Sequence, residues 1–427
     1  MVLDRKLFEN RSFLIKQIML DLSIYFLCIF FIKRISDLGT FSYLYISLWI
    51  FSSYLFDRYH LRDINQNLLI KYFSKTLLIY LLLLGINFLI LDNFVFNLGF
   101  LVSSLFSQIF FIKLNLKYLN RKQKWLTNDI KLMNFYISSK SLFKNNILYF
   151  YDKKNEVEFQ KYNGFLIDIK SVDDSIMSIL KNKKFLKKYF SLEWCEEFIE
   201  LIPLDLLENT NLEEKILISK VEGFLKLFKR LFEFIFSLFI LILCFPLIIF
   251  FSFLVFLHDG LPIFYSQLRT GKNNKKIRIY KIRSMKKDSE KNGPQWSTNK
   301  DPRITVIGRL IRKYRIDELP QLLSVFNGDL SLIGPRPERP EIDKILKKDI
   351  YLYNKRYLVN PGITGWAQVN YPYAASLKDA RIKQSYDLYY VKNVSIILDL
   401  IIVFKTIRLI LNRRGATPLP DNDSSCF

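Results

Sequence analysis

The sequence predicts a membrane protein of mixed class, membrane α plus α/β. Five apolar stretches are long enough, or nearly so, to enter a bilayer. Short strand-like runs lie between the fourth and fifth stretches, and a basic region with Gly and Pro motifs follows the fifth. We therefore expect a four-helix transmembrane N-terminal bundle, a small cytoplasmic α/β domain, and a mixed α+β domain anchored by a Pro-broken membrane helix.

Composition supports membrane association and anionic partners. The chain has 427 residues, which predicts two or three domains, and half of them are hydrophobic. Lys and Arg exceed Asp and Glu by 63 − 40 = 23. Such a surplus suits lipid headgroups and phosphorylated substrates, or nucleic acid, and the apolar stretches favour the first. Four cysteines without paired spacing and two histidines indicate neither a disulfide framework nor a zinc site.

Residues 1–125 are predicted to form four transmembrane helices. Their Lys and Arg counts, taken before, between and after the apolar runs, are 4, 2, 4, 0 and 5. Because cytoplasmic loops carry the excess of positive charge, the N-terminus and everything after residue 113 are expected in the cytoplasm. The four apolar runs are 13–32, 41–56, 76–91 and 94–112.

Residues 126–222 are predicted to form a small α/β domain. Three short apolar runs suggest strands and one longer run suggests a helix. A dinucleotide site is not expected, because Gly164 is the one glycine between Gly99 and Gly223 and no Gly-rich phosphate loop is present. A packing or regulatory role is predicted instead. The expected strands are 135–137, 147–151 and 165–169, and the expected helix is 174–184.

Residues 223–258 are predicted to form a re-entrant membrane helix. The apolar run 234–257 is long enough to span a bilayer, with Pro246 at its midpoint. Lys and Arg flank it on both sides, and a single crossing would export one basic flank. A helix that breaks at Pro246 and returns keeps both flanks in the cytoplasm. An ordinary transmembrane helix with a proline kink is the alternative.

Residues 259–417 are predicted to form the α+β domain. The runs 263–268 and 277–282 flank a Gly/Asn turn and predict a β-hairpin that carries Lys281 and Arg283. Residues 394–411 have helical periodicity, and predict either an interfacial helix or a core helix. The polar tail 418–427 is predicted to be disordered.

The adjacent acids Asp317 and Glu318 are the candidate reactive pair. Such a pair alone more often marks a solvated helix face, but this one ends a basic amphipathic run. Cations close to a carboxylate lower its pKa and can also meet phosphate, which suits a carboxylate nucleophile that attacks a phosphoryl group. Seven cations lie within 40 residues of the pair: Lys281, Arg283, Arg303, Arg309, Arg312, Arg315 and Arg336.

Six consecutive motifs resemble the bacterial sugar transferases that act on polyprenyl phosphate, the monotopic phosphoglycosyl transferases. The resemblance covers residues 223–415. It implies a re-entrant helix, although Phe245 precedes the proline where relatives often carry Ser, and a Rossmann-like fold for the middle domain. The motifs are Lys-Ile-Arg-Ser-Met (281–285), Asp-Pro-Arg (301–303), Asp-Glu-Leu-Pro-Gln-Leu (317–322), Gly328 to Pro337, Pro-Gly-Ile-Thr-Gly-Trp-Ala-Gln (361–368) and Tyr-Asp-Leu-Tyr-Tyr (386–390).

The resemblance implies transfer of a sugar 1-phosphate from a UDP-sugar to undecaprenyl phosphate, with release of UMP. Asp317 would be the nucleophile and form a phosphosugar-enzyme intermediate. Glu318 would hold Mg²⁺. Asp387 is a second metal-ligand candidate, with a helix cap as the alternative. Such a reaction would begin lipid-linked glycan synthesis for an exopolysaccharide, a capsule or an O-antigen.

The remaining candidate residues are expected to bind the substrates. Arg336, between Pro335 and Pro337, resembles the family's nucleotide or phosphate contact, and Gly334 would let the backbone approach a ligand. Lys281 is also assigned to the substrate. Arg283 and Arg303 are assigned to substrate phosphate, with structural pairing equally open. Arg309, Arg312 and Arg315 are expected to contact lipid headgroups.

Two other functions stay open from the residues alone. One is a membrane-tethered basic scaffold without chemistry, and the other is a metal-dependent glycosyltransferase that releases UDP. Nucleic acid is not an expected partner, since no groove of stacking aromatics accompanies the charge. The expected location is the bacterial inner membrane, with the catalytic domain facing the cytoplasm. Homo-oligomerisation and the identity of the sugar are left open.

Overall fold

The computed structural model divides into two compact units, Met1–Gln123 and Lys124–Phe427, which we describe separately. Two predicted elements lie outside the described residues, namely the helix at 174–184 and the tail at 418–427. The structure describes residues 12–32, 41–56, 58–60, 73–83, 94–119, 123–143, 146–151, 159–168, 187–208, 224–287, 289, 301–371 and 376–411.

The first unit is helical and coincides with the four predicted apolar runs. Its helices share one core, in which Tyr25, Tyr45, Trp49, Ile79 and Phe100 are buried against one another. Aromatic edges meet aromatic faces there; the ring centroids of Trp49 and Phe100 are 5.0 Å apart. The helices are α2 (Ser12–Ile32), α3 (Phe41–Leu55), Phe73–Leu83 and α5 (Phe94–Leu119), with a 3₁₀ turn η1 (Arg58–His60) after α3.

A charged pair lies at the centre of this unit. Arg58 Nη1 is 2.5 Å from Asp21 Oδ2, and both side chains are fully buried. Tyr59 and Trp49 also donate to Oδ2, while Ser104 donates to Oδ1. Because every partner comes from a different helix or from η1, one satisfied polar network joins the helices.

The surface of the first unit has the opposite character. Large apolar side chains on α2, on Phe73–Leu83 and on α5 are exposed, among them Phe30 and Phe106. The Asp21–Arg58 pair is thus enclosed while large apolar side chains face outward, the reverse of a water-soluble bundle.

One helical segment among the described residues, Lys229–Asp259, is long and apolar enough to cross a membrane. It forms most of α11 (Phe224–Asp259), in the second unit. Three other apolar helical segments are shorter, Leu44–Leu55, Phe73–Leu83 and Gly99–Phe111. The detailed transmembrane arrangement of the first unit therefore stays a prediction.

The N-terminal part of the second unit contains a four-stranded sheet in the order β2-β1-β3-β4. β3 pairs in parallel with β1 and with β4. The predicted strands at 147–151 and 165–169 correspond to β2 and β3. The strands are β1 (Gln123–Thr127), β2 (Asn146–Phe150), β3 (Gly164–Ile167) and β4 (Lys187–Phe190).

The strand predicted at 135–137 is wrong, because these residues belong to the helix α6 (Ile130–Ser138). Asp129 caps this helix by accepting a hydrogen bond from the backbone N–H of Leu132. Leu132, Phe135 and Tyr136 are buried, at the i, i+3, i+4 spacing of one helix face. Helical periodicity and the cap outweigh the strand propensity of the aromatic residues.

Among the described residues, two further α-helices, a π-helix and two 3₁₀ turns belong to this part of the unit. The α-helices are α8 (Ser191–Trp194) and α9 (Leu204–Leu207), the π-helix is η4 (Cys195–Ile199), and the 3₁₀ turns are η2 (Lys140–Phe143) and η3 (Phe159–Lys161).

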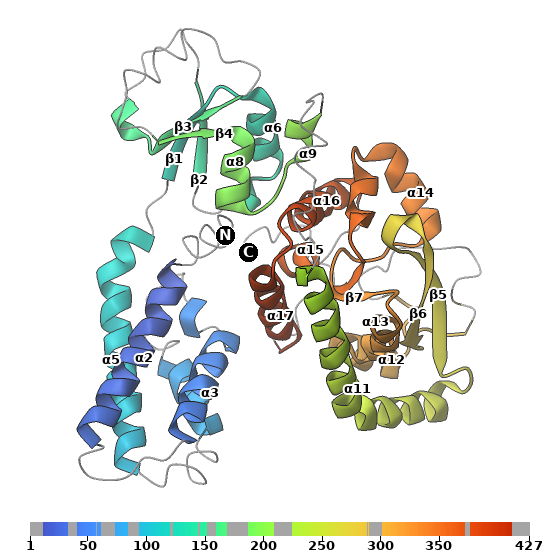
Figure 1. Ribbon diagram of the computed structural model, residues 1–427, viewed down its shortest axis with the longest axis horizontal. Helices are drawn as coiled ribbons and strands as arrows, with labels where there is room; N and C mark the ends of the chain where they lie inside the picture. Colours follow the sequence, from blue (N-terminus) through green and yellow to red (C-terminus); the bar gives the residue numbers. More distant parts are fainter. Residues whose placement is uncertain are drawn as a thin grey trace. The chain divides into compact units, whose positions relative to one another are not determined.

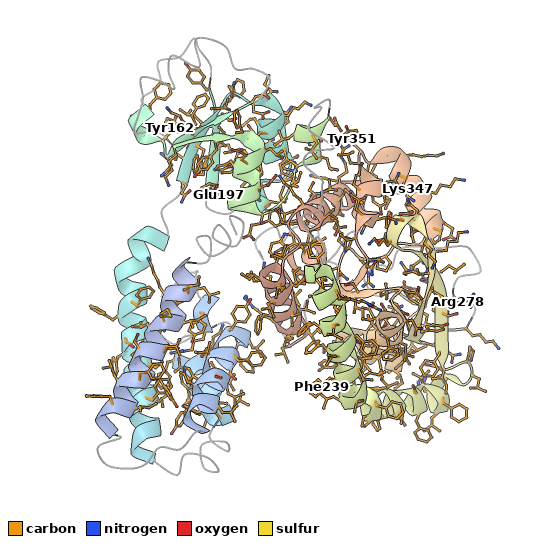
Figure 2. The ribbon with its side chains drawn as sticks, in the orientation of Figure 1. Tyr162, Glu197, Phe239, Arg278, Lys347 and Tyr351 are labelled. Carbon is orange, nitrogen blue, oxygen red and sulfur yellow. The ribbon has the colours of Figure 1, made fainter. Side chains whose placement is uncertain are left out.

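The long helix α11 follows a bent course (Figure 1) and contains Pro246. Proline removes a backbone N–H and clashes with the preceding turn, which accounts for a bend in a continuous helix. Much of α11 presents exposed apolar side chains, including that of Phe239, labelled in Figure 2. Its inner face packs Ile248 and Val255 against Ile311 and Ile316 of the following domain.

The C-terminal part has the predicted mixed α+β character. The predicted hairpin is present as β5 (Phe264–Thr270) and β6 (Lys276–Ile282), joined by the 3₁₀ turn η5 (Lys272–Asn274). A second, parallel pair consists of β7 (Ser331–Ile333) and β8 (Gly362–Thr364). The helices are α12 (Val306–Lys313), α13 (Leu322–Asn327), α14 (Pro340–Asp349), α15 (Trp366–Asn370), α16 (Leu377–Lys392) and α17 (Ile396–Leu411), with 3₁₀ segments η6 (Ile316–Gln321) and η7 (Tyr353–Leu358).

The Arg58–Asp21 pair predicts a test of the first unit. Replacing Arg58 with Met leaves the buried Asp21 carboxylate without its counter-charge, which should lower the free energy of unfolding by about 3–5 kcal/mol. Chemical denaturation of the detergent-solubilised protein, followed by tryptophan fluorescence, measures the change. The matched control is Lys16→Met, which removes an exposed cation from α2, the helix that carries Asp21. Equal stability of Arg58→Met and wild type would contradict the structural role of the pair.

Candidate active site

The acidic pair lies in η6, immediately after the basic helix α12. Arg315, at the start of η6, has the left-handed conformation (φ 58°), which turns the chain sharply between the two helices. Asp317 and Glu318 are both buried, with 6% and 7% of their surfaces exposed. Within the described residues, no hydrogen bond or ion pair engages the Asp317 side chain.

Glu318 is neutralised by three cations. Oε1 accepts hydrogen bonds from Lys281 Nζ at 2.8 Å and from Arg336 Nη2 at 2.6 Å. Oε2 accepts a hydrogen bond from Arg315 Nη1 at 3.3 Å. Lys281 comes from β6, Arg315 from the turn before η6, and Arg336 from the segment after β7. The structure therefore gathers three of the predicted cations on one carboxylate.

The pKa values of the two carboxyl groups shift in opposite directions. Burial acts to raise the pKa of Glu318, but Arg336, Lys281 and Arg315 hold it well below its usual range. Burial raises the pKa of Asp317 to about 6, and the negative charge of Glu318 adds to this rise. The expectation that the pKa of the nucleophile is lowered overall is therefore wrong for Asp317. Lys281, Arg312 and Arg315 do act to lower it, but burial and the negative charge of Glu318 outweigh them.

The segment that carries Arg336 is held at almost every backbone group. Gly334 donates its N–H to the Thr364 carbonyl, and the Pro335 carbonyl accepts from the N–H of Gly362. A Cβ on Gly334 would lie 2.3 Å from the Asn360 carbonyl oxygen. The close approach that requires this glycine is therefore to the backbone around β8, not the approach to a ligand that the sequence suggested.

Arg283 and Arg303 make structural contacts. Arg283 Nη2 donates to the carbonyls of Asp259 at 2.5 Å and Gly260 at 2.7 Å, which caps the C-terminal end of α11. Arg303 forms a bidentate pair with Asp301, with Nε and Nη2 donating at 2.8 and 2.6 Å. Of the two alternatives, structural pairing is the one that the structure shows for both arginines.

The three arginines assigned to lipid headgroups separate in the structure. Arg315 bonds Glu318, as described above. Arg312 is partly buried and donates from Nε to Ser284 Oγ at 2.7 Å. Arg309 is exposed on α12. Arg309 alone keeps the surface position that the prediction required.

Asp387 lies inside α16 and is 1% exposed. Ser376 caps that helix, so the helix-cap alternative for Asp387 is wrong. The Asp387 carboxylate lies 2.8 Å from Arg356 Nη2, and burial raises its pKa to about 6. Among the described residues, no hydrogen bond or ion pair joins it to Asp317 or Glu318.

Asp317 and Glu318, which we call the dyad, offer carboxylate oxygen donors of the kind that fit Mg²⁺. Mg²⁺ commonly binds through one or two carboxylates together with substrate phosphates and waters, so it needs no dedicated cage. The described residues contain no cluster of three or more His, Cys, Asp or Glu side chains that could hold a metal. Glu318 already accepts hydrogen bonds from three cations.

Sequence analysis missed two arginines next to this site. Arg269 on β5 donates from Nη1 to the Pro337 carbonyl at 3.1 Å. Arg356 in η7 donates from Nη2 to the Arg336 carbonyl at 2.9 Å. Neither stands in a motif with a mechanistic meaning, so no local signal distinguishes it from an ordinary surface cation.

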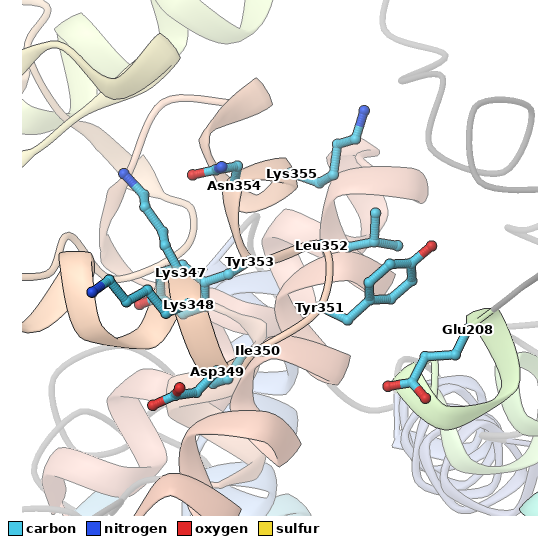
Figure 3. A pocket seen from close by; sticks show the side chains of 10 residues that line it. All are labelled: Glu208, Lys347, Lys348, Asp349, Ile350, Tyr351, Leu352, Tyr353, Asn354 and Lys355. Carbon is cyan, nitrogen blue, oxygen red and sulfur yellow. The ribbon is translucent and has the colours of Figure 1, made fainter.

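A pocket of about 490 Å³ lies apart from the dyad. Figure 3 shows Tyr351 on the side of Glu208, with Lys347 and Lys348 across the pocket. Neither acid of the dyad nor any cation that bonds Glu318 lines it. The pocket therefore does not coincide with the candidate site.

Comparison with known proteins identifies the region that holds the dyad. Residues 224–413 match the family described as bacterial sugar transferase. The UDP-N-acetylgalactosamine-undecaprenyl-phosphate N-acetylgalactosaminephosphotransferase of Aeromonas hydrophila is 49% identical over 171 residues, which are 40% of this chain and 40% of that relative. The match therefore spans less than half of that protein's length.

Two other relatives are matched over most of their own length. A putative undecaprenyl-phosphate N-acetylgalactosaminyl 1-phosphate transferase of Bacillus subtilis is 46% identical over 128 residues, 30% of this chain and 72% of the relative. The exopolysaccharide production protein PSS of Rhizobium leguminosarum is 37% identical over 185 residues, 42% of this chain and 92% of the relative.

The raised pKa of Asp317 predicts pH-dependent labelling. Carbodiimides react with protonated carboxyl groups, so modification of Asp317, read by mass spectrometry, should fall as the pH rises through about 6. In Glu318→Gln the midpoint should move to lower pH, because the neighbouring negative charge is lost and its three cations are released. Glu338→Gln, which removes a carboxylate that does not raise the pKa of Asp317, is the control. A wild-type midpoint near 4 would contradict the assignment.

Proposed function

Because the chain belongs to the bacterial sugar transferase family, we propose that it transfers a sugar 1-phosphate from a UDP-sugar to undecaprenyl phosphate and releases UMP. One observation carries this proposal. Asp317 is buried and unpaired within the described residues, beside a carboxylate that three cations neutralise. A nucleophile for phosphorus and a binding site for phosphate thus lie side by side.

Two displacements at phosphorus make up the proposed reaction. In the first, an Asp317 oxygen attacks the phosphorus that bears the sugar, the bond to the bridging oxygen breaks, and UMP leaves with the bonding electrons. In the second, an oxygen of undecaprenyl phosphate attacks the same phosphorus and releases the Asp317 carboxylate. The products are UMP and an undecaprenyl diphosphate sugar.

The environment of Asp317 suits this role at neutral pH. With a pKa of about 6, the carboxylate is roughly ten times more abundant than the acid at pH 7. No ion pair of the described residues lowers its reactivity. Burial excludes water, which would otherwise hydrolyse the intermediate. Asp317 therefore combines ionisation with weak solvation.

The cations around Glu318 are the proposed contacts of the donor diphosphate. Lys281 and Arg336 both bond Oε1 and can turn toward phosphate oxygens when the donor arrives. We assign Glu318 to Mg²⁺, which would supply charge neutralisation at the diphosphate. Arg336, in its fixed Pro-Arg-Pro backbone, is the least mobile of these groups.

We propose that the chain acts at the bacterial inner membrane with the catalytic domain in the cytoplasm. Exposed apolar side chains cover α11 and the helices of the first unit, while Asp21 and Arg58 are enclosed. These features support four crossings in the first unit and a re-entrant α11 bent around Pro246. The parallel sheet of β1, β3 and β4 supports a Rossmann-like packing or regulatory domain.

The two relatives named for N-acetylgalactosamine make UDP-N-acetylgalactosamine the first donor to test. The relative named for exopolysaccharide production supports a role in the synthesis of a surface glycan. A glycosyltransferase would release UDP, and a scaffold would release neither nucleotide. The leaving group therefore separates the three functions.

Asp317→Asn should abolish turnover. The amide keeps the shape of the side chain but is not a nucleophile, so UMP release from UDP-sugars should fall at least about a thousandfold while the protein stays in the membrane fraction. Asp329→Asn, the same change outside the site, is the control. Denaturing mass spectrometry should find the added sugar phosphate on wild type with donor alone. Retained UMP release in Asp317→Asn would exclude the covalent mechanism.

The re-entrant course of α11 predicts that both of its ends are cytoplasmic. Single cysteines at Leu227 and Lys275, in a background with the native cysteines replaced, should both resist a membrane-impermeant maleimide added outside intact spheroplasts. Both should react after permeabilisation. A cysteine in an external loop of a known membrane protein serves as the positive control. Labelling of either position before permeabilisation would show that α11 spans the membrane.

A further inference from the structure

We propose that Arg356, held by Asp387, is a positioning residue that sets the place of Arg336 at the dyad. This inference rests on the proposed function, in which Arg336 meets the donor's phosphates. It replaces the metal-ligand role predicted for Asp387 with an indirect role through a second arginine.

Four consecutive carbonyl groups fix the backbone on either side of Arg336. Pro335 and Pro337 have no N–H, so this segment cannot join a β-ladder through its own donors. Its carbonyls take donors from other elements instead. The donors are Gly362 N to Pro335 O at 2.9 Å, Arg356 Nη2 to Arg336 O at 2.9 Å, Arg269 Nη1 to Pro337 O at 3.1 Å, and Thr270 N to Glu338 O at 2.9 Å.

Arg356 donates to the backbone carbonyl of Arg336. The side chain of Arg336 reaches Glu318 Oε1 at 2.6 Å. A shift of the Arg336 backbone therefore changes the position of the Arg336 guanidinium relative to Asp317 and Glu318. The two prolines restrict the adjacent φ angles, so the hydrogen bond from Arg356 sets the remaining freedom of the segment.

Besides its bond to the Arg336 carbonyl, the Arg356 guanidinium is held by two further contacts. Nη2 lies 2.8 Å from Asp387 Oδ2, and Nη1 donates to the Tyr353 hydroxyl at 2.6 Å. The side chains of Arg356 and Asp387 are 7% and 1% exposed. A cation buried to this degree needs a counter-charge, which Asp387 supplies from the middle of α16. Gln384, on the same helix, donates to the Leu352 carbonyl at 3.0 Å and so ties η7 to α16.

Lysine cannot reproduce this arrangement. The planar guanidinium directs separate N–H groups at the Arg336 carbonyl and at the Tyr353 hydroxyl while its charge lies beside Asp387, whereas an ammonium group keeps the charge without that fork. Arg356→Lys therefore separates the positioning role from charge balance, because Asp387 keeps a cation beside it.

A pair that served stability alone would behave differently. Its loss would reduce the amount of folded enzyme and leave the KM of the remaining molecules unchanged. A metal-ligand role for Asp387 would appear as a changed Mg²⁺ requirement. A positioning role should raise the KM for the donor, as loss of Arg336 does, without moving the Mg²⁺ half-saturation.

The test is a double-mutant cycle on the full chain in lipid nanodiscs. Donor KM is measured by UMP release, and UDP affinity is measured by calorimetry as a readout independent of turnover. Arg336→Ala and Arg356→Lys should each weaken both quantities by about tenfold, and the double variant should be within about twofold of Arg336→Ala, because the side chain being positioned is then absent. Asp387→Asn should reproduce Arg356→Lys with an unchanged Mg²⁺ half-saturation.

The matched control is Lys355→Met, which removes a cation from the neighbouring position of η7. Additive effects of Arg336→Ala and Arg356→Lys would overturn the proposal, as would a shifted Mg²⁺ half-saturation in Asp387→Asn. If Arg356→Lys does not fold, Asp387→Asn replaces it as the second variant of the cycle.

Wild type without UMP release but with UDP binding would refute the proposed function, and the cycle measured by UDP binding would still decide the role of Arg356. Wild type that does not bind UDP would overturn the positioning role.

Discussion

The neutralisation of Glu318 by Lys281, Arg315 and Arg336 is the interaction on which the site depends. A carboxylate as buried as Glu318 is stable only with counter-charges beside it. By attracting the cations, Glu318 leaves the adjacent Asp317 without an ion partner among the described residues. Burial raises the pKa of Asp317 to about 6, and the charge of Glu318 adds to this rise. Glu318 thus gathers the proposed phosphate contacts and contributes to the ionisation behaviour of the proposed nucleophile.

The fold brings these cations together from distant parts of the chain. The hairpin strand β6 carries Lys281, the turn after α12 carries Arg315, and the segment after β7 carries Arg336. α11 packs against the same domain, with Ile248 and Val255 in contact with the hydrophobic cluster that includes Ile311 of α12. One hydrophobic cluster therefore joins α11 to α12 and to Ile316, the residue that precedes the acidic pair.

A buried ion pair also holds the helices of the first unit together. Asp21 and Arg58 form a fully enclosed pair that joins four helical segments, and large apolar side chains face outward. In a bilayer this arrangement is favourable, because lipid solvates the outer surface and the pair satisfies itself. The two units thus use buried ion pairs for different purposes, one for the packing of helices and the other for the ionisation of a reactive group.

The sequence by itself determined the mixed α and β character of the C-terminal part, the hairpin and the long apolar helix that contains Pro246, because each depends on local patterning and on motifs close in the chain. It misjudged residues 135–137, where a helix cap and helical spacing prevail over strand propensity. It also could not decide among the cations. Only the tertiary structure showed that Arg283 caps α11, that Arg303 pairs with Asp301, and that Arg356 holds the backbone of Arg336. Such roles depend on which charges meet after folding, and pairing between groups far apart in the chain leaves no mark on local sequence.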